Sequence, residues 1–408
     1  MSQDSTERQL AGIRVLDLAT SYAGPTAAMY LGDLGADVIK VERPGGEDAR
    51  QWGPPFVDED SAWFLSANRG KRSICLDIRV PAGREVLMRL LERADVLIVS
   101  FNPSKLASLG LDPPTLTNRF PRLIYCALSG FGLSGPDSSL PGYDLIAQAR
   151  SGLMSVTGAA GDAPQRVSTA LTDVMAGTVA AMAIVAAIVG RTRSGKGQAI
   201  DVSLLDAALA LMAPRIASFG AGEPEPRPSG ATDSVLSIYQ TFPTADRPVV
   251  VAVGNDSMWE RFCNVVGLSE LAGRPDLQTN AGRRDHRDEL ISVIAEQTAV
   301  LPSQVLLERL HQAAIPCSPV QFLNDVLTDP QVVARRSIRP IAHPGPEVTP
   351  IVAQPWRIVG ETQHDTLPAA PALGQHGVNI LLEVGCTDDE IDRLIEEGAL
   401  WADLTKTP

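Results

Sequence analysis

The sequence predicts an α/β fold with a doubly wound, Rossmann-like layer, because short apolar runs alternate with helical patterns through its first half. Residues 13–19 and 38–41 are typical of strands, and residues 24–34 between them form a helical pattern rich in small side chains. Further strands are predicted at residues 73–78, 96–101 and 123–129. These runs are apolar without interruption, as expected for a sheet that helices cover on both faces.

The length of 408 residues is too great for one ordinary core and predicts two or three structural units. Residues 221–230 are rich in Gly, Pro, Glu and Ser, a composition typical of a linker. We therefore predict a large domain that begins with residues 1–220 and a small domain at residues 231–330. Residues 331–408 form a return segment, which ends in an acidic helix at 387–397.

The composition is that of a globular protein, with 44% apolar and 20% charged residues. The formal net charge is −13, from 35 Lys and Arg against 48 Asp and Glu. Nucleic acids and anionic membranes require broad cationic surfaces, so we expect neither as a partner. An anionic small molecule would need a local basic pocket.

The five cysteines are far apart and form no CxxC pair, which indicates neither a disulfide framework nor a zinc site. The first ten residues are polar and lack the apolar stretch of a signal peptide. Residues 174–190 carry no charge, but a run of 17 residues is short for a membrane span. We interpret it as a helix buried in the core and expect a cytoplasmic protein.

Three common kinds of enzyme site are not supported. The first strand-to-helix turn, at residues 19–25, lacks the G-x-G-x-x-G motif of nicotinamide enzymes, although Glu42 ends the second strand as a ribose-binding acid would. The histidines show no i, i+4 pairing and no nearby cysteine at metal-ligand spacing, so we predict no metal site. No G-x-S-x-G elbow of a serine hydrolase is present.

A basic cluster stands out against the acidic background. Arg69, Lys71 and Arg72 precede a predicted strand, and Arg43 comes earlier in the chain. A loop there could present several cations to a phosphate-bearing ligand. The alternative is a solvated loop that balances the surrounding acids, and composition alone favours it.

Asp173 immediately precedes the charge-free run, at the expected start of a helix. The helix dipole and free backbone N–H groups there would hold a carboxylate ionised. An ionised, partly desolvated carboxylate is what a carboxylate nucleophile requires. The alternative is an N-cap aspartate, which is common and structurally sufficient.

Motifs in the same order along nearly the whole chain resemble those of the family III CoA-transferases, also called the CaiB/BaiF family. They are LGDLGADVIKVERPG (31–45), NRGKRS (68–73), PGYDL (141–145), TDVMAG (172–177), the Gly254-Asn255-Asp256 segment and PALGQH (371–376). Any single motif is weak evidence. A collinear series of this length is strong evidence.

The resemblance implies a large α/β domain formed by the N- and C-terminal segments, a smaller α/β domain between them, and an interlocked homodimer. It also implies a CoA-transferase of class EC 2.8.3 that uses an acyl-CoA and a small carboxylic acid, with no permanently bound cofactor. By this resemblance Asp173 forms a mixed anhydride and then an aspartyl-CoA thioester. Backbone N–H groups around Gly254 and Asn255 are the expected oxyanion donors.

The resemblance further assigns the contacts with coenzyme A to Arg43, Arg69, Lys71, Arg72, Phe101, Lys105 and Tyr143. Ser100, Asn102 and Ser108 depart from the family, because Asn and Arg often stand there and help to hold CoA; Lys105 is expected to compensate in part.

Tyr22, beside the expected active site, replaces a Gln of oxalate-using relatives, so formyl-CoA:oxalate exchange is not expected. Succinyl-CoA is a donor consistent with family habit, but the sequence does not name the two acids. The main alternative is a 2-methylacyl-CoA racemase or epimerase, which needs an acid/base pair, typically His with Asp; residues 130–144 contain no His. A non-catalytic CoA-binding protein is a further alternative.

Overall fold

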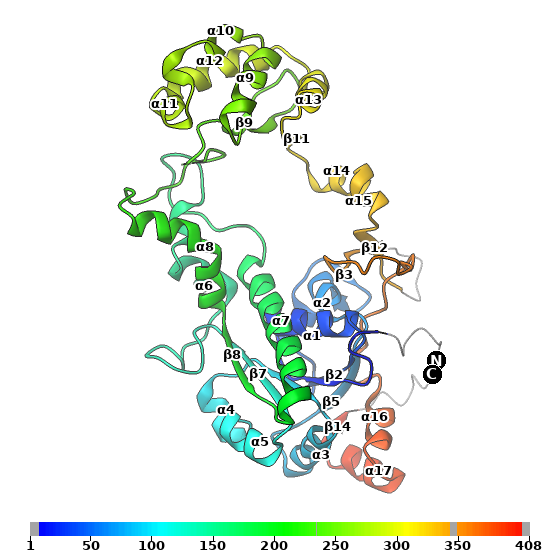
Figure 1. Cartoon of the computed structure of the whole chain (residues 1–408). Coiled ribbons are helices and arrows are strands. Elements are labelled where there is room, and N and C mark those ends of the chain that lie inside the picture. Colours follow the sequence, from blue (N-terminus) through cyan, green and yellow to red (C-terminus); the bar gives the residue numbers. More distant parts are fainter. Residues whose placement is uncertain (1–7, 234, 343–348, 402–408) are drawn as a thin grey trace. The chain divides into compact units, whose positions relative to one another are not determined.

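The structure is a computed structural model that describes residues 8–233, 235–342 and 349–401 (Figure 1). The chain divides into two compact units, which are described separately. The large unit consists of Met1–Leu153, Arg166–Glu223 and Val333–Pro408, and the small unit of Met154–Gln165 and Pro224–Val332. The segment Met154–Gln165 therefore clusters with the small unit, whereas the sequence-based boundary assigned it to the large domain.

A seven-stranded sheet in the order β14-β5-β2-β1-β6-β7-β8 forms the centre of the large unit. All its strand pairs are parallel except that of β14 with β5, which confirms the predicted α/β class. From β1 the order runs outward in both directions, so β1 and β6 form a switch point where α/β proteins commonly bind ligands. The strands are β1 (Arg14–Asp17), β2 (Asp37–Glu42), β5 (Arg72–Leu76), β6 (Val96–Val99), β7 (Ile124–Ser129), β8 (Ala199–Ser203) and β14 (Leu400–Trp401).

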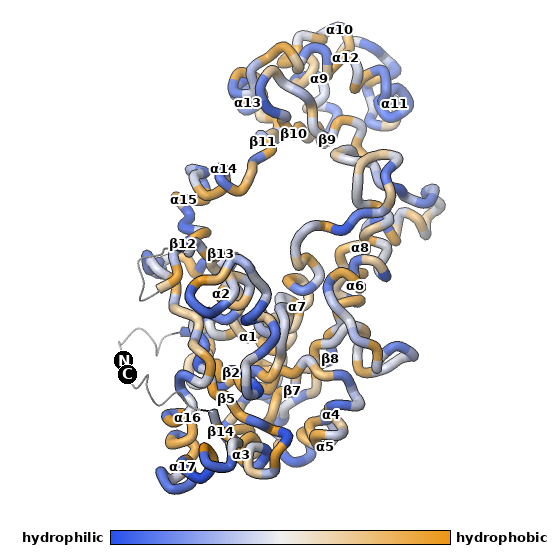
Figure 2. The backbone as a smooth tube through the Cα atoms, turned by 180° about the vertical axis from the view of Figure 1, so that it is seen from behind, coloured by the Kyte–Doolittle hydropathy of each residue, from blue (hydrophilic) through white to orange (hydrophobic). Residues whose placement is uncertain are grey.

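Helices cover both faces of this sheet, and each face has its own apolar core. One core joins the sheet to α1 (Ala23–Asp33), α6 (Asp144–Arg150), α7 (Leu171–Ser194) and α8 (Leu204–Gly220). The other joins it to α3 (Pro81–Glu92), α4 (Pro103–Leu109), α5 (Pro113–Arg119), α16 (Gly377–Glu383) and α17 (Asp388–Glu396). Figure 2 shows the contrast between the hydrophobic sheet and the largely hydrophilic outer helix α17.

The charge-free segment lies in α7, which has the length and composition of a membrane-spanning helix. One face packs closely on α1, because a Cβ atom at Gly177 would lie 2.6 Å from the carbonyl oxygen of Ala23. The opposite face leaves Met182 66% and Val189 52% exposed. The prediction of a buried core helix is therefore only half correct, since a lack of charge does not reveal which face packs.

The return segment completes the sheet of the large unit. The helices α16 and α17 (red in Figure 1) lead to β14, which pairs antiparallel with β5. Thr387 and Glu390 cap α17 reciprocally: the Thr387 Oγ1 accepts from the Glu390 N–H at 3.2 Å, and the Glu390 carboxylate accepts from the Thr387 N–H at 3.0 Å. This capping box fixes the helix start that the sequence predicts.

Short elements connect the main layers of the large unit. They are β3 (Phe56–Val57), β4 (Asp60–Ser61), α2 (Ala62–Asn68) and the ribbon of β12 (Ile338–Pro340) with β13 (Pro350–Val352).

The small unit contains a three-stranded antiparallel sheet in the order β11-β10-β9. Its core includes the buried side chains of Trp259, Phe262 and Leu306. The strands are β9 (Tyr239–Phe242), β10 (Val249–Ala252) and β11 (Cys317–Pro319), and the helices are α9 (Asp256–Val265), α10 (Ser269–Ala272), α11 (Asn280–Asp285), α12 (Arg287–Ala299), α13 (Ser303–Gln312) and α14 (Leu323–Thr328). The helix α15 (Pro330–Ala334) spans the boundary with the large unit.

Candidate functional site

The large unit contains a cavity of about 520 Å³ at the carboxyl ends of its parallel strands. It therefore lies at the edge of the sheet where ligand sites are expected in this class of fold. The loops after β1, β2, β5, β6 and β7 all contribute to its wall. The lining includes Thr20, Ser21, Arg43, Glu47, Arg79, Phe101, Lys105, Gly130, Tyr143 and Asp173.

Asp173 lines this cavity from the first turn of α7. The N-cap of α7 is Ala170, and no side chain caps the helix, so the cap interpretation of Asp173 is wrong. Burial, and secondly the negative charge of Asp144, raise the pKa of Asp173 to about 7. This corrects the expectation that the helix N-terminus holds Asp173 fully ionised, because loss of solvation outweighs the helix dipole here.

Asp144, the first residue of α6, anchors the start of α7. Its Oδ1 accepts hydrogen bonds from the backbone N–H and the hydroxyl of Thr172, both at 2.7 Å. Its Oδ2 accepts from Gln148 Nε2 at 2.6 Å, and the Gln148 Oε1 accepts from the Val167 N–H at 2.8 Å. Thr172 is adjacent to Asp173, so this buried network fixes the position from which the Asp173 carboxylate enters the cavity.

Tyr22 lies at the N-cap of α1, and its environment is coupled to that of Asp173. Burial raises the Tyr22 pKa, and the charge of Asp173 raises it further, against the lowering effect of a hydrogen bond with Ser66. The Tyr22 hydroxyl lies 3.0 Å from Ser66 Oγ, and its ring meets the Trp63 ring edge to face at a centroid distance of 5.4 Å. The phenol is therefore fixed near the proposed nucleophile.

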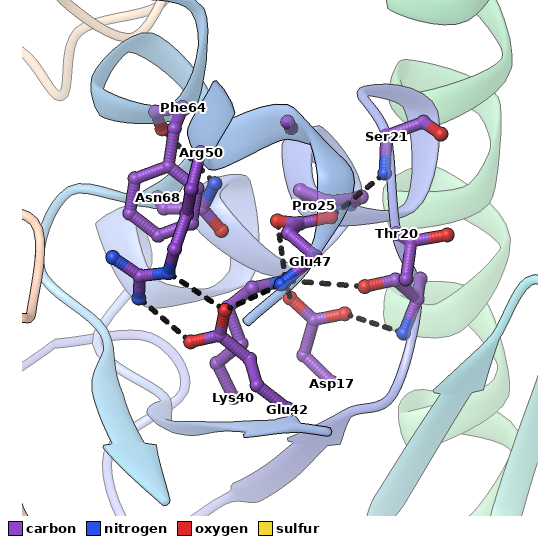
Figure 3. A network of polar contacts seen from close by, with 12 residues as sticks. Asp17, Thr20, Ser21, Pro25, Lys40, Glu42, Glu47, Arg50, Phe64 and Asn68 are labelled. Carbon is purple, nitrogen blue, oxygen red and sulfur yellow. Dashed lines mark hydrogen bonds and ion pairs between the residues drawn. The ribbon is translucent and has the colours of Figure 1, made fainter. Parts of the chain in front are cut away.

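Buried charges hold the loop between β1 and α1 that forms one wall of the cavity (Figure 3). Lys40 Nζ donates to the carbonyl oxygen of Ala19 at 3.1 Å and forms an ion pair with Glu47 at 2.9 Å. The other Glu47 oxygen accepts from the Ser21 N–H at 2.8 Å. Ser21 has a φ of 72°, in the left-handed region that non-glycine residues rarely adopt. The paired charges stabilise this loop conformation.

The predicted phosphate-binding loop requires a correction, because Arg69, Lys71 and Arg72 do not line the cavity. Arg69 is 3% exposed and pairs with Asp33, at 2.7 Å for one of its contacts. Arg72 pairs with Asp37 at 2.7 Å and with Glu383 at 2.6 Å. The loop precedes β5, so it approaches the sheet from the amino end of that strand and not from its carboxyl end.

Lys71 is also committed to contacts within the protein. Its buried Nζ donates to Asp17 at 2.8 Å, to the Pro25 carbonyl oxygen at 2.9 Å and to Asn68 Oδ1 at 2.7 Å. All three ammonium protons are therefore used. Lys71 ties β1 to α1 and has no free donor for a ligand.

Arg43, Lys105 and Arg79 are cations that do line the cavity. Arg43 follows β2, and Lys105 Nζ lies 3.8 Å above the centroid of the Phe101 ring. Burial, and secondly the charge of Arg43, lower the Lys105 pKa. Arg79 follows β5 and pairs with Asp77 at 2.7 Å. The sequence analysis missed Arg79, although its place just after the carboxyl end of a parallel strand would have identified it.

The three positions that depart from the family motif have local structural partners. Ser100 Oγ accepts from the Thr20 N–H at 3.0 Å and so holds the β1–α1 loop. Asn102 caps α4 by accepting from the Lys105 N–H at 2.9 Å. Ser108 Oγ donates to the Lys105 carbonyl oxygen at 2.8 Å. The remaining cation that lines the cavity, Lys40, is committed to Glu47 and the Ala19 carbonyl oxygen, unlike Arg43, Arg79 and Lys105.

Gly254 and Asn255 belong to the small unit, where Asn255 Oδ1 caps α9 by accepting from the Met258 N–H at 3.0 Å. Their role as oxyanion donors stays a prediction. Within residues 8–233, 235–342 and 349–401, no group of three or more His, Cys, Asp or Glu could hold a metal ion.

Comparison with known proteins identifies the family. Residues 10–377 match CoA-transferase family III. The chain is 38% identical over 382 residues to succinate–glutarate CoA-transferase of Agrobacterium fabrum, covering 92% of this chain and 95% of that protein. It is 35% identical over 395 residues to human succinyl-CoA:glutarate CoA-transferase, covering 96% and 90%. It is also 35% identical over 386 residues to succinyl-CoA:mesaconate CoA-transferase of Haloarcula hispanica, covering 92% and 96%.

A solved structure shows the same fold. The crystal structure of a CaiB/BaiF family protein from Brucella suis is 36% identical and matches with a TM-score of 0.80. The match covers 91% of this chain and 98% of that one.

We expect Asp173→Asn to be more stable than the wild type at pH 8 and equally stable near pH 4. The pKa of about 7 lies above the ordinary value of 3.8, so the folded state favours the protonated carboxyl. That stability is complete below pH 4 and is lost as the pH rises through 7, which gives the neutral variant an advantage of at most about 4 kcal/mol at pH 8. Denaturant unfolding at both pH values measures it.

Asp392→Asn is the control, because it makes the same chemical change at an exposed site on α17. Its stability relative to the wild type should not depend on pH. Equal pH dependence of the Asp173→Asn and Asp392→Asn variants would contradict the raised pKa.

Proposed function

The chain belongs to CoA-transferase family III, and from this premise we propose that it transfers coenzyme A from an acyl-CoA donor to a small carboxylic acid, with Asp173 as the nucleophile. The observation that carries this proposal is the position of Asp173 in a cavity that the cationic side chains of Arg43, Arg79 and Lys105 also line. At a pKa of about 7, a substantial fraction of Asp173 is ionised at neutral pH, and its carboxylate is more basic than an ordinary one.

The proposed reaction begins when an Asp173 oxygen attacks the acyl carbonyl of the thioester. The CoA thiolate leaves with the bonding electrons, and an anhydride joins Asp173 to the acyl group. The thiolate then attacks the Asp173 carbonyl, which releases the first carboxylate and leaves an aspartyl-CoA thioester. The acceptor carboxylate reverses these two exchanges. No net proton transfer is needed, so an acid/base partner for Asp173 is not required.

The surrounding residues supply positioning and charge. Asp144 fixes the start of α7, so the Asp173 carboxylate re-forms in the same place after each exchange. We assign the phosphates of CoA to Arg43, Arg79 and Lys105, and contacts along the cavity wall to Phe101 and Tyr143. Guanidinium groups are well suited to phosphate because they offer paired donors.

We further propose succinyl-CoA as the donor and a dicarboxylic acid as the acceptor. The names of the human and Haloarcula hispanica relatives pair succinyl-CoA with glutarate and with mesaconate. A matrix of acyl-CoA donors against mono- and dicarboxylic acids, with product thioesters identified by mass spectrometry, tests this assignment. Faster exchange with monocarboxylic acids throughout the matrix would contradict it.

The racemase alternative lacks support from the site. Proton exchange at the α-carbon requires an acid and a base on either side of it. Among the residues that the structure describes, no histidine lines the cavity. Incubation of a 2-methylacyl-CoA in D₂O should therefore give no deuterium at the α-carbon.

We expect the Asp173→Asn variant to lose turnover while it keeps its fold, because an amide cannot form the anhydride or the thioester. Wild type incubated with acyl-CoA and no acceptor should carry a CoA adduct on the peptide that contains Asp173. Borohydride should reduce that adduct to an alcohol, and hydroxylamine should trap it as a hydroxamate. Adduct formation should accelerate as the pH rises through about 7.

Asp144→Asn keeps the hydrogen-bond acceptor for Thr172 but removes the negative charge next to Asp173. The pH at which adduct formation accelerates should therefore be lower in this variant than in the wild type. A functional Asp173→Asn enzyme, or an adduct that maps to another residue, would show that the nucleophile is misassigned.

Cavity cations should control the affinity for acyl-CoA. Arg79→Ala should raise the KM for acyl-CoA by about tenfold, because one charge-assisted phosphate contact is worth roughly 1.5–3 kcal/mol. Arg72→Ala is the matched control, because it removes the same side chain from the amino end of the same strand, where it pairs with Asp37 and Glu383. It should lower stability and leave the KM unchanged. A raised KM in Arg72→Ala with an unchanged KM in Arg79→Ala would show that CoA binds elsewhere.

We also propose that the protein is a homodimer and resides in the cytoplasm. Large apolar side chains on α7 and α8 are exposed in the large unit, among them Met182, Val189 and Phe219, which is 54% exposed. A second copy that covers them would remove this apolar surface from water. If the two chains interlock, sedimentation at decreasing concentration should show dimer only. A reversible monomer–dimer equilibrium under native conditions would contradict the interlocked arrangement.

A further inference from the structure

A second cavity, of about 290 Å³, lies in the large unit beside the β12–β13 ribbon. Its wall comes from the residues just before β12, from the end of β13 and the segment that follows it, and from Gln363. It shares no lining residue with the cavity of Asp173. The lining consists of Arg335, Arg336, Ser337, Val352, Ala353, Gln354, Pro355, Trp356, Arg357 and Gln363.

Three arginines face one small volume in a chain whose net charge is −13. Arg336 pairs with the exposed Asp365 at 2.9 Å. Arg335 and Arg357 have no carboxylate partner within the described part of the chain. Like charges this close repel one another unless an anion balances them.

A fourth arginine stands directly behind the wall. Arg339 is 6% exposed and donates to the His364 carbonyl oxygen at 2.9 Å and to Gln354 Oε1 at 3.3 Å. Its buried Nε has no hydrogen-bond partner among the described residues. Burial lowers the Arg339 pKa and the charges of Arg69 and Arg357 lower it further, whereas the Asp33 carboxylate opposes them in part. Three arginines thus line the cavity and a fourth lies behind it, and the carboxylates that act on them are Asp365 on Arg336 and Asp33, which Arg69 also holds, on Arg339.

The remaining wall includes an aromatic side chain, Trp356, that is fixed by its neighbour. Trp356 meets the Tyr30 ring edge to face, with centroids 5.1 Å apart and an angle of 75° between the ring planes. This contact ties the cavity wall to α1, so the wall does not depend on the ribbon alone. A rigid aromatic surface beside several guanidinium groups is an arrangement that recognises small organic anions.

We propose that this second cavity binds a small anion with two or more phosphate or carboxylate groups. The two unpaired guanidinium groups of Arg335 and Arg357 supply paired donors to its oxyanions. Gln354 connects the site to the buried charge of Arg339. The ligand balances the excess positive charge, which solvent screens only in part near Arg339. This site is separate from the transferase cavity and does not depend on the proposed reaction.

Titration calorimetry at low ionic strength tests the proposal, with pyrophosphate and citrate as separate probes. The double variant Arg335→Ala/Arg357→Ala should weaken binding of at least one probe by about tenfold or more. Loss of pyrophosphate affinity identifies a phosphate ligand, and loss of citrate affinity identifies a polycarboxylate. Either result supports the site. Transferase activity measured without the probes should stay unchanged.

Two control variants locate the binding. Arg84→Ala removes an exposed arginine of α3 and should bind both probes like wild type. Arg43→Ala/Arg79→Ala removes two cations of the transferase cavity. Weaker probe binding in that variant alone would overturn the proposal, because the anions would then occupy the CoA site. Wild-type affinity for both probes in the Arg335→Ala/Arg357→Ala variant would also overturn it.

Hydrogen exchange on the unmodified protein gives a readout that does not depend on any variant. The bound probe should slow amide exchange in residues 335–339 and 352–357. Absence of both measurable heat and protection at millimolar probe would refute the second site.

Discussion

A buried cluster of charges at the carboxyl ends of β1 and β2 sets the geometry on which the rest of the large unit depends. Asp17 is fully buried between Lys71, at 2.8 Å, and Lys40, at 3.9 Å. Burial of one unpaired charge would cost several kcal/mol, so each member requires the others. The two ammonium groups have pKa values shifted in opposite directions. Burial lowers the Lys71 pKa to about 8. The carboxylates around Lys40 outweigh the effect of burial and raise the Lys40 pKa. These side chains can therefore adopt few other positions without leaving a buried charge unpaired, so the cluster holds the neighbouring backbone in place.

Two anchors of this kind define opposite walls of the same cavity. The charge cluster holds the β1–α1 loop through Glu47, and Asp144 holds the start of α7 through Thr172. The close approach of α1 and α7 at Gly177 links the two walls. The carboxylate of Asp144 has a second effect, because its charge helps to raise the pKa of Asp173. One buried side chain thus both positions the proposed nucleophile and adds to the effect of burial on its pKa.

The sequence predicted the features that depend on local patterns. Apolar runs located the strands, and the collinear motifs singled out Asp173, which lines the cavity. Features that depend on distant partners were not predictable in this way. Arg72 looked available for a ligand because its partner Glu383 lies 311 residues away. The absence of charge in α7 indicated burial but could not show that only one face packs. The helix-dipole argument for Asp173 omitted the cost of desolvation, which only the folded surroundings reveal.

Position relative to a strand, more than the number of basic residues, decides which cations can serve a ligand. In a parallel sheet all carboxyl ends meet at one edge, so residues just after strands gather there from distant parts of the sequence. Arg43 and Arg79 follow β2 and β5 directly and line the cavity. Arg69 and Arg72 are equally basic, but they stand before or at the start of β5, away from the cavity. Acidic partners do not make the difference, because Arg43 and Arg79 pair with Asp48 and Asp77 as Arg69 and Arg72 pair with Asp33 and Asp37. A chain with a net charge of −13 can therefore present a local basic surface to a polyanionic substrate, since the topology brings Arg43, Arg79 and Lys105 to one edge of the sheet.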